Sequence, residues 1–216
     1  MRCIVTAGPT YEPLDKVRRL TNFSTGRLGS ELSNFLTAQG HEVTFLIGQL
    51  ATYHGTPHAQ STHIFSTTTH LRDTLCSLGG DTVAAVFHAA AVSDFTFGKI
   101  WNRSEQGELT EKRSGKLSTR EGTLLAELLP TKKIINELRE FFPKALLVGW
   151  KYEIDGDRAN VIRLAQEQMA QCRTDACVAN GPAYGLGFGL VQSNGCAHHK
   201  QSLSLFTALE KLIGQH

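Results

Sequence analysis

The chain has 216 residues, of which 41% are hydrophobic and 19% charged, with a formal net charge of +2 at pH 7. This composition excludes a disordered chain, and the length suits a single α/β domain over residues 1–216. The small net charge, without a basic tract, gives no indication of nucleic-acid binding. The sequence lacks a signal-peptide pattern and an apolar stretch long enough to cross a membrane, so we expect a cytoplasmic protein without membrane contacts.

The five cysteines are odd in number and contain no C-x-x-C pair. They therefore indicate neither a disulfide framework nor a zinc site, and we expect reduced, mostly buried thiols.

Short apolar runs alternate with stretches of helical periodicity along the chain. In chain order the patterns predict a strand over 2–7, a helix over 27–39, strands over 41–48 and 63–66, a helix over 69–78, a strand over 83–92, a helix from Pro130 to about 142, a strand over 145–150, a helix over 157–171, a strand over 176–179, a hairpin turn at 193–195 and a helix over 204–213. Continuous apolar strands that alternate with helices are typical of parallel sheets covered on both faces. We therefore predict a doubly wound, Rossmann-like, mostly parallel sheet with a C-terminal hairpin.

One segment departs from this alternation. Residues 96–122 are rich in charged side chains and poor in apolar ones. A long loop inside a compact domain is usually functional or disordered. We favour a functional, mobile flap.

The first predicted strand and the first predicted helix are separated by a long polar insert. The compact G-x-G-x-x-G turn of dinucleotide-binding proteins is absent, because Gly8 ends the strand and Gly26 comes eighteen residues later. The helix start still offers free N–H groups, the Ser24 and Thr25 hydroxyls and a positive dipole end, which suits a phosphate. A simple helix N-cap with a packing glycine explains the same residues about as well.

The insert also brings Asp15, Arg18, Arg19 and Asn22 to the carboxyl end of the first strand. Ligands bind at this end of the strands in open α/β sheets. Taken singly, however, each of these residues is more typical of a solvated loop than of a site.

Six blocks of sequence, in order, resemble the phosphopantothenoylcysteine synthetase family of coenzyme A biosynthesis. They are "TAGPTYEPLDKVRRLTNFSTGRLG", "HAAAVSDF", "GKLS", "LLPTKKII", "VGWKYE" and "DACVANG". The resemblance implies a ligase that uses CTP or ATP, with Mg²⁺, to activate the carboxylate of 4'-phosphopantothenate as an acyl nucleotide. L-Cysteine then displaces the nucleoside monophosphate. Such a site must position three substrates and stabilise developing charge, and a long insert provides the additional walls.

The resemblance also implies roles for particular residues. Asn22 matches an asparagine that handles the acyl nucleotide, and Arg18 matches an arginine of the second half-reaction. Lys116 matches a flap lysine that reaches the phosphates, where a cation stabilises negative charge; without the resemblance it would be taken for a solvated lysine. Lys112 and Arg113 are weaker candidates. The family's insert takes part in dimer contacts, so we expect a homodimer whose sites draw on both subunits.

Further nucleotide-binding candidates follow strands of the predicted sheet. Ala90 and Ala91 allow a base or acyl chain to approach the backbone, although tight core packing explains them too. Asp94 is a candidate Mg²⁺ ligand or, almost equally, a turn aspartate. Lys151 and Asn180 match family blocks near the nucleotide.

Two other features bear on function. His88 lies within an apolar run, and we interpret it as a core histidine. The block Trp150-Lys151-Tyr152-Glu153 departs from the common bacterial pattern, which leaves the choice between CTP and ATP open. The sequence has no room for the flavin-dependent decarboxylase domain fused to many family members, so we expect no flavin.

Two alternatives compete with the ligase. The doubly wound pattern also suits an NAD(P)-dependent oxidoreductase of the short-chain type, which the missing glycine turn and the absence of a Tyr-x-x-x-Lys pair on a predicted helix disfavour. The altered WKYE block suits a non-catalytic nucleotide-binding relative. Fold analogy does not separate the three.

Overall fold

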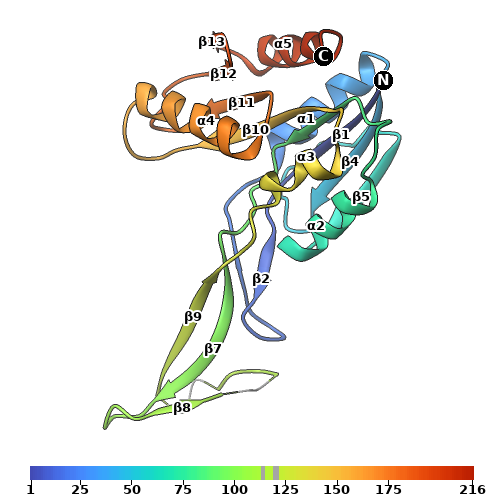
Figure 1. The fold of residues 1–216 in the computed structure, drawn as a ribbon. Coiled ribbons are helices and arrows are strands. Elements are labelled where there is room, and N and C mark those ends of the chain that lie inside the picture. Colours follow the sequence, from blue (N-terminus) through green and yellow to red (C-terminus); the bar gives the residue numbers. More distant parts are fainter. Residues whose placement is uncertain (113–114, 119–121) are drawn as a thin grey trace.

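The computed structural model describes residues 1–112, 115–118 and 122–216. Within them the chain forms an eight-stranded sheet in the order β13-β12-β11-β10-β6-β1-β4-β5, in which the strands from β11 to β5 are parallel and β12 and β13 antiparallel (Figure 1). Its strands are β1 (Arg2–Ala7), β4 (Glu42–Gly48), β5 (Ser61–Phe65), β6 (Ala85–His88), β10 (Leu146–Tyr152), β11 (Ala176–Asn180), β12 (Phe188–Gln192) and β13 (Gly195–His199). The predicted doubly wound α/β fold and its C-terminal hairpin are confirmed.

Helices cover both faces of this sheet. They are α1 (Arg27–Ala38), α2 (Thr68–Ser77), α3 (Leu138–Phe141), α4 (Arg158–Cys172) and α5 (Ser202–Ile213), with the short 3-10 helix η1 (Ile134–Asn136) before α3. Leucines of α1 and α5 pack on one face, against residues such as Val5 and Phe87. Residues of α2, η1 and α3 pack on the other face, and α4 packs there against β11. Successive residues of a strand point to opposite faces of the sheet, and both faces are buried here. Each strand therefore consists of a continuous apolar run.

The direction of winding reverses between β1 and β6. From β1 the chain proceeds through β4 to β5 at one edge, then returns to β6 and continues through β10 and β11 toward the other edge. The loops that follow β1 and β6 therefore diverge from adjacent strand ends. In open α/β sheets this switch point forms the ligand crevice.

The polar insert after β1 forms a small antiparallel hairpin of β2 (Tyr11–Pro13) and β3 (Arg19–Thr21), with Tyr11 paired to Thr21. Its base is fixed by Glu12, whose buried carboxylate accepts hydrogen bonds from the Thr68 N–H (3.0 Å) at the start of α2 and from the Thr96 hydroxyl (3.2 Å). The insert is thus an ordered hairpin anchored to two neighbouring segments.

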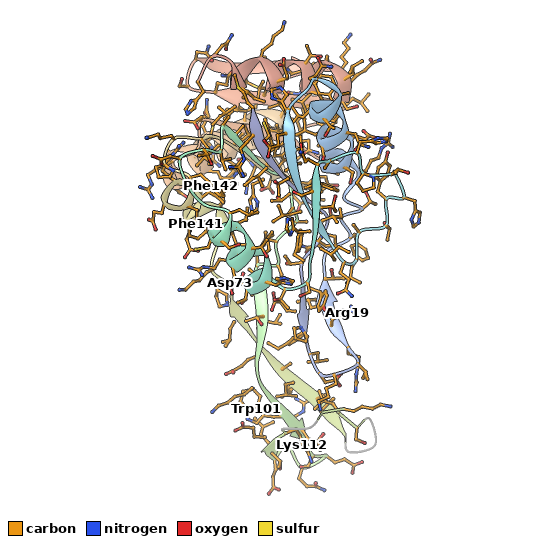
Figure 2. The ribbon with its side chains drawn as sticks, turned by 90° about the vertical axis from the view of Figure 1, so that its right-hand side faces the viewer. Arg19, Asp73, Trp101, Lys112, Phe141 and Phe142 are labelled. Atoms are coloured by element: carbon orange, nitrogen blue, oxygen red, sulfur yellow. The ribbon has the colours of Figure 1, made fainter. Side chains whose placement is uncertain are left out.

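Part of the flap expected over residues 96–122 is instead regular strand. β7 (Phe95–Arg103), β8 (Leu109–Glu111) and β9 (Thr123–Pro130) form a separate sheet in the order β8-β7-β9, which we call the arm. It projects away from the large sheet (Figure 1), and Trp101 and Lys112 lie at its far end (Figure 2). The strands of the arm are only partly buried, and the charged residues of the segment lie mainly between them, so the segment as a whole lacks the continuous apolar runs of the large sheet.

Two predicted element boundaries are also wrong. The helix predicted from Pro130 does not start there, because Pro130 ends β9 opposite Phe95 and the following helices are short. Proline is tolerated at the end of an edge strand because no ladder N–H is required there. The strand predicted over 83–92 is regular only at 85–88. The small residues after it instead form a loop that bonds to the insert.

Candidate active site

The loops after β1 and β6 are joined by backbone hydrogen bonds at the switch point. The Ala91 N–H donates to the Gly8 carbonyl (3.0 Å), and the Thr10 N–H donates to the Ala91 carbonyl (3.1 Å). Asn22, at the end of the insert hairpin, reaches the same place: its Nδ2 donates to the carbonyls of Ala91 (3.1 Å) and Val92 (3.4 Å). The structure therefore brings together three of the predicted site residues, Gly8, Asn22 and Ala91.

A buried pair of side chains supports the loop from below. The Thr6 hydroxyl lies 3.0 Å from His88 Nδ1 and accepts a hydrogen bond from the Ala90 N–H at 3.1 Å. His88 is only 6% exposed, and burial lowers its pKa to about 4. The interpretation of His88 as a core histidine is confirmed. Thr6 was missed as a support of the site, because a threonine within a strand reads only as strand propensity.

Glycines bring the start of α1 against the end of β1. Gly8 and Gly26 both have φ of 78°, a region that favours glycine. A Cβ on Gly26 would lie 3.2 Å from Gly8 Cα, and one on Gly29 would lie 2.6 Å from Ala7 Cβ. Larger residues would therefore push the helix away from the strand.

The N-terminus of α1 faces this junction. Among the described residues no side chain makes a cap hydrogen bond at Gly26, although the Thr25 hydroxyl accepts from the Arg27 N–H at 3.3 Å. The alternative explanation of Ser24 and Thr25 as a helix N-cap is therefore not met, because the N-cap residue is Gly26, and their predicted phosphate-binding role stays a prediction. The helix dipole and the first-turn N–H groups favour an anion at this position.

The ends of β10 and β11 extend the same sheet edge. Gly149 pairs with His88, so Lys151 lies two residues further along, toward the loop after β6. Its ammonium is 2.8 Å from the Glu153 carboxylate. On β11 the Asn180 Oδ1 is buried without a hydrogen-bond partner among the described residues, as is the Trp150 Nε1 on β10. Unpaired buried polar atoms are costly, so these two atoms mark places where a ligand atom would be satisfied. Trp150 was not predicted as a binding residue, because the nucleotide-binding role was assigned to its neighbour Lys151.

The tip of the insert hairpin holds the flap segment that contains Lys116. The Asp15 carboxylate accepts from the N–H groups of Val17 (2.9 Å), Arg18 (2.8 Å) and Leu117 (3.1 Å), and Arg18 Nη2 lies 2.9 Å from it. Burial of this carboxylate favours its neutral form, but the three N–H donors and the Arg18 charge outweigh burial and lower the pKa of Asp15. Asp15 is one of the charged residues of the insert, but no role was predicted for it from the sequence.

The predicted catalytic residues therefore fall into two groups. Arg18 and Lys116 belong to the hairpin tip, and Asn22 belongs to the switch point. Arg18 and Asn22 are four positions apart in an extended segment, a span of up to about 13 Å. Lys116 is exposed and is placed beside Arg18 by its neighbour Leu117. Arg113 lies outside the described residues.

Asp94 lies at the end of the loop after β6, and its side chain is exposed. Its backbone carbonyl accepts from the Thr131 N–H at 2.9 Å, which ties the start of the arm to its end. In residues 1–112, 115–118 and 122–216 no group of three His, Cys, Asp or Glu side chains is arranged to hold a metal ion. Asp94 therefore contributes at most a single carboxylate.

No helix in the described part of the chain has the length and apolar character needed to cross a membrane.

Comparison with known proteins identifies the family. Residues 1–208 match the model of the DNA/pantothenate metabolism flavoprotein C-terminal domain. The chain belongs to this family. The coenzyme A biosynthesis bifunctional protein CoaBC of Thermococcus kodakarensis is 32% identical over 181 residues, which are 83% of this chain and 41% of that protein. The chain thus spans about two fifths of that relative's length. The family resemblance seen in the sequence is confirmed.

Solved structures support the fold. The DNA/pantothenate metabolism flavoprotein of Streptococcus pneumoniae superposes with a TM-score of 0.86 at 24% identity, over all of both chains. A Cab2 mutant in complex with phosphopantothenate-cysteine superposes with a TM-score of 0.74 at 18% identity, over all of this chain and 88% of the other. At these identities the likeness establishes the architecture alone.

Proposed function

We propose that the protein is a phosphopantothenate–cysteine ligase. It activates the carboxylate of 4'-phosphopantothenate with a nucleoside triphosphate, which releases pyrophosphate. It then transfers the acyl group to the amine of L-cysteine, which releases the nucleoside monophosphate and a proton. The observation that carries this proposal is the junction of Asn22 with the Ala91 carbonyl at the switch point, in a chain of this family. The Cab2 mutant of the same fold holds phosphopantothenate-cysteine, which is the product expected here.

The switch point provides what acyl transfer requires. The Asn22 amide carries two hydrogens, so on substrate binding it can keep its bond to the Ala91 carbonyl (3.1 Å) and exchange the longer one to the Val92 carbonyl (3.4 Å) for the acyl oxygen of the intermediate. Oxygen atoms that gain negative charge in a transition state are stabilised by such preorganised donors. The N–H groups at the start of α1, beside Gly8 and Gly26, receive a phosphate group.

The nucleotide extends from the switch point toward β10 and β11. There the buried Asn180 Oδ1 and Trp150 Nε1 offer one acceptor and one donor to a base, and Lys151 offers a positive charge to a phosphate. The bases of CTP and ATP both carry an exocyclic amino group, which can donate a hydrogen bond to an amide oxygen. The Asn180 and Trp150 atoms alone therefore do not decide between CTP and ATP. A triphosphate arrives with Mg²⁺, which commonly keeps several waters and one or two carboxylates. The exposed Asp94 suits this role.

The flap supplies the cation. Lys116 stands next to Leu117, which is held at the hairpin tip, and its ammonium stabilises charge on the attacked α-phosphate. In the described structure the flap segment is docked on the tip. The proposed closure over the nucleotide then requires the hairpin and flap to move toward the switch point together, or a flap contributed by a second subunit.

The arm suits an interface with a second copy of this chain. Leu109, Leu128 and Leu129 on its strands are 56%, 50% and 45% exposed, and Phe23 near the hairpin base is 105% exposed. Apolar side chains gathered on a projecting element commonly mark an interaction surface. We propose a homodimer formed through the arms.

A single assay tests the ligase. The protein is incubated with 4'-phosphopantothenate, L-cysteine, Mg²⁺ and either CTP or ATP, and pyrophosphate is measured. We expect release that depends on both the triphosphate and phosphopantothenate, and the faster nucleotide identifies the preference. If neither nucleotide gives pyrophosphate release and the protein binds NADPH, the oxidoreductase would be supported instead. If neither gives release but the protein binds CTP or ATP, a non-catalytic relative would be supported.

Two variants assign the steps. Lys116→Gln should slow pyrophosphate release, since the flap loses its cation. Asn22→Asp should release pyrophosphate but accumulate the acyl nucleotide, detected by mass spectrometry, because a carboxylate cannot donate to the acyl oxygen. Lys211→Gln, at an exposed lysine on α5 away from the insert and the flap, is the matched control for loss of one exposed lysine. A Lys116→Gln enzyme as fast as the control would remove Lys116 from the mechanism.

A further inference from the structure

The insert hairpin holds the flap through one buried carboxylate. The Asp15 side chain is 1% exposed although it lies in a polar turn. Two of its donors, the N–H groups of Val17 and Arg18, come from its own turn and shape the hairpin tip. The other two, the Leu117 N–H and the Arg18 guanidinium, connect the tip to a segment about one hundred residues later in the sequence.

The flap backbone is held on both sides of Lys116. After it, the Leu117 N–H donates to Asp15 at 3.1 Å, and the Leu117 carbonyl accepts from Arg18 Nη2 at 2.6 Å. Before it, the Gly115 carbonyl accepts from the Lys16 N–H at 3.0 Å. The Leu117 side chain is 4% exposed. Lys116 is therefore the central residue of a three-residue segment whose two flanking peptide groups are both fixed.

We propose that Asp15 is a positioning residue for the reaction: with Arg18 it latches flap residues 115–117 to the insert hairpin and thereby sets where the Lys116 ammonium can reach. This inference rests on the proposed ligase function for its catalytic consequence, and on the geometry alone for the latch. It gives Arg18 a second task besides the one that family resemblance implies. It also explains why an acidic side chain stands in a region that must accommodate anionic substrates.

Only a carboxylate fits this position. Asp15 offers acceptors on both oxygens, whereas an asparagine offers one oxygen and one NH₂ group. In Asp15→Asn the NH₂ group would face either the Leu117 N–H or the N–H groups of the turn, and Arg18 would lose its charged partner. A buried donor left without an acceptor is costly. The substitution therefore opens the latch while preserving the size of the side chain.

Amide hydrogen exchange at Leu117 tests the latch independently of enzyme activity. In Asp15→Asn the protection of the Leu117 amide should fall by roughly tenfold or more, from the loss of a charge-assisted hydrogen bond, while amides of β1 keep their protection. The matched control is Asp73→Asn, which removes a carboxylate that is 62% exposed on α2, on the body of the molecule (Figure 2). It should leave the Leu117 amide unchanged.

Kinetics then test whether the latch acts through Lys116. With pyrophosphate release as the readout, Asp15→Asn should lower kcat about tenfold with little change in the KM of the triphosphate, because the flap cation acts in the transition state. The double variant Asp15→Asn/Lys116→Gln should be no slower than Lys116→Gln alone. Additive losses in the double variant would overturn the positioning role, since they would show that Asp15 acts independently of Lys116.

The two proposals fail in different ways. Unchanged Leu117 exchange in a folded Asp15→Asn protein overturns the latch, whether or not the protein is a ligase. If the unaltered protein releases no pyrophosphate, the ligase proposal falls and with it the catalytic consequence, while exchange still decides the latch. If Asp15→Asn fails to fold, Arg18→Gln replaces it, because it removes the hydrogen bond to the Leu117 carbonyl and should also expose the Leu117 amide.

Discussion

Lowering the pH should destabilise the protein through His88. This side chain is 6% exposed, and burial lowers its pKa to about 4, whereas an unfolded histidine has a pKa of about 6.5. As pH falls, the unfolded chain takes up the proton first, so the stability contributed by the neutral ring is complete above about pH 6.5. It is lost progressively as pH falls toward 4.

The magnitude follows from the two pKa values. At pH 5 the unfolded ring is almost fully protonated and the folded ring almost fully neutral, so proton binding favours unfolding by about 2 kcal/mol relative to pH 8. Below pH 4 the loss approaches about 3 kcal/mol, which corresponds to the whole shift in pKa. A typical domain has a free energy of unfolding of about 5–15 kcal/mol, so the loss at pH 5 is readily measurable.

Urea denaturation at pH 8 and pH 5 measures this effect. The comparison is with His88→Gln, which keeps a polar side chain but cannot titrate. Other groups titrate equally in both proteins, so the unaltered protein should lose about 2 kcal/mol more than the variant between these pH values. If the variant does not fold, NMR of the unaltered protein gives the answer, because the His88 ring signals should not shift between pH 8 and pH 5. A folded-state pKa near 6.5, or equal losses in both proteins, would refute the burial argument.

Three further predictions concern packing, thiols and assembly. Gly29→Ala should destabilise the protein by about 1–3 kcal/mol in urea denaturation, because its Cβ would lie 2.6 Å from Ala7 Cβ. Gly214→Ala, with φ of −80° and a Cβ that would lie 3.8 Å from its nearest neighbouring atom, is the unstrained control, and an equal change in both variants would contradict the steric argument. A disulfide reagent at pH 8 should label Cys76 first and Cys196 more slowly, because burial raises the pKa of Cys196 as well. Cys3, Cys172 and Cys177 are buried, and burial raises the pKa of Cys3 to about 11 and of Cys177 to about 12, so rapid labelling of more than two thiols would contradict their burial. Leu128→Glu on the arm should convert the proposed dimer to a monomer in sedimentation, whereas a monomeric unaltered protein would refute the arm interface.

The sheet was predictable because its strands are buried on both faces. The strand over 2–7 and the helix over 27–39 were predicted to within one residue of β1 and α1, since continuous apolar runs and helical periodicity are strong local signals. The hairpin at 193–195 was predictable from Asn194-Gly195, a pair that suits tight turns. The proximity of Gly8 and Ala91 was predictable, because both follow parallel strands whose carboxyl ends meet at one edge of the sheet, and their role in binding stays a prediction.

The arm and the latch were not predictable for a different reason. The strands of the arm pair with one another outside the large sheet, and the charged residues that led to the loop prediction lie mainly between β7 and β9, over residues 104–122. Asp15 and Leu117 are 102 positions apart in the sequence. No local sequence pattern around either residue indicates a contact with the other. Local patterns encode elements that bury a face, whereas contacts between exposed elements depend on geometry that only the assembled sheet defines.

The two groups of candidate residues are connected by the insert hairpin. Its base places Asn22 on the Ala91 carbonyl at the switch point, and its tip holds the flap through Asp15 and Arg18. A paired hairpin transmits displacement along its length better than a flexible loop does, because its two strands are hydrogen-bonded. The long ordered insert therefore connects the two groups of candidate residues at its two ends, which a short glycine turn could not do.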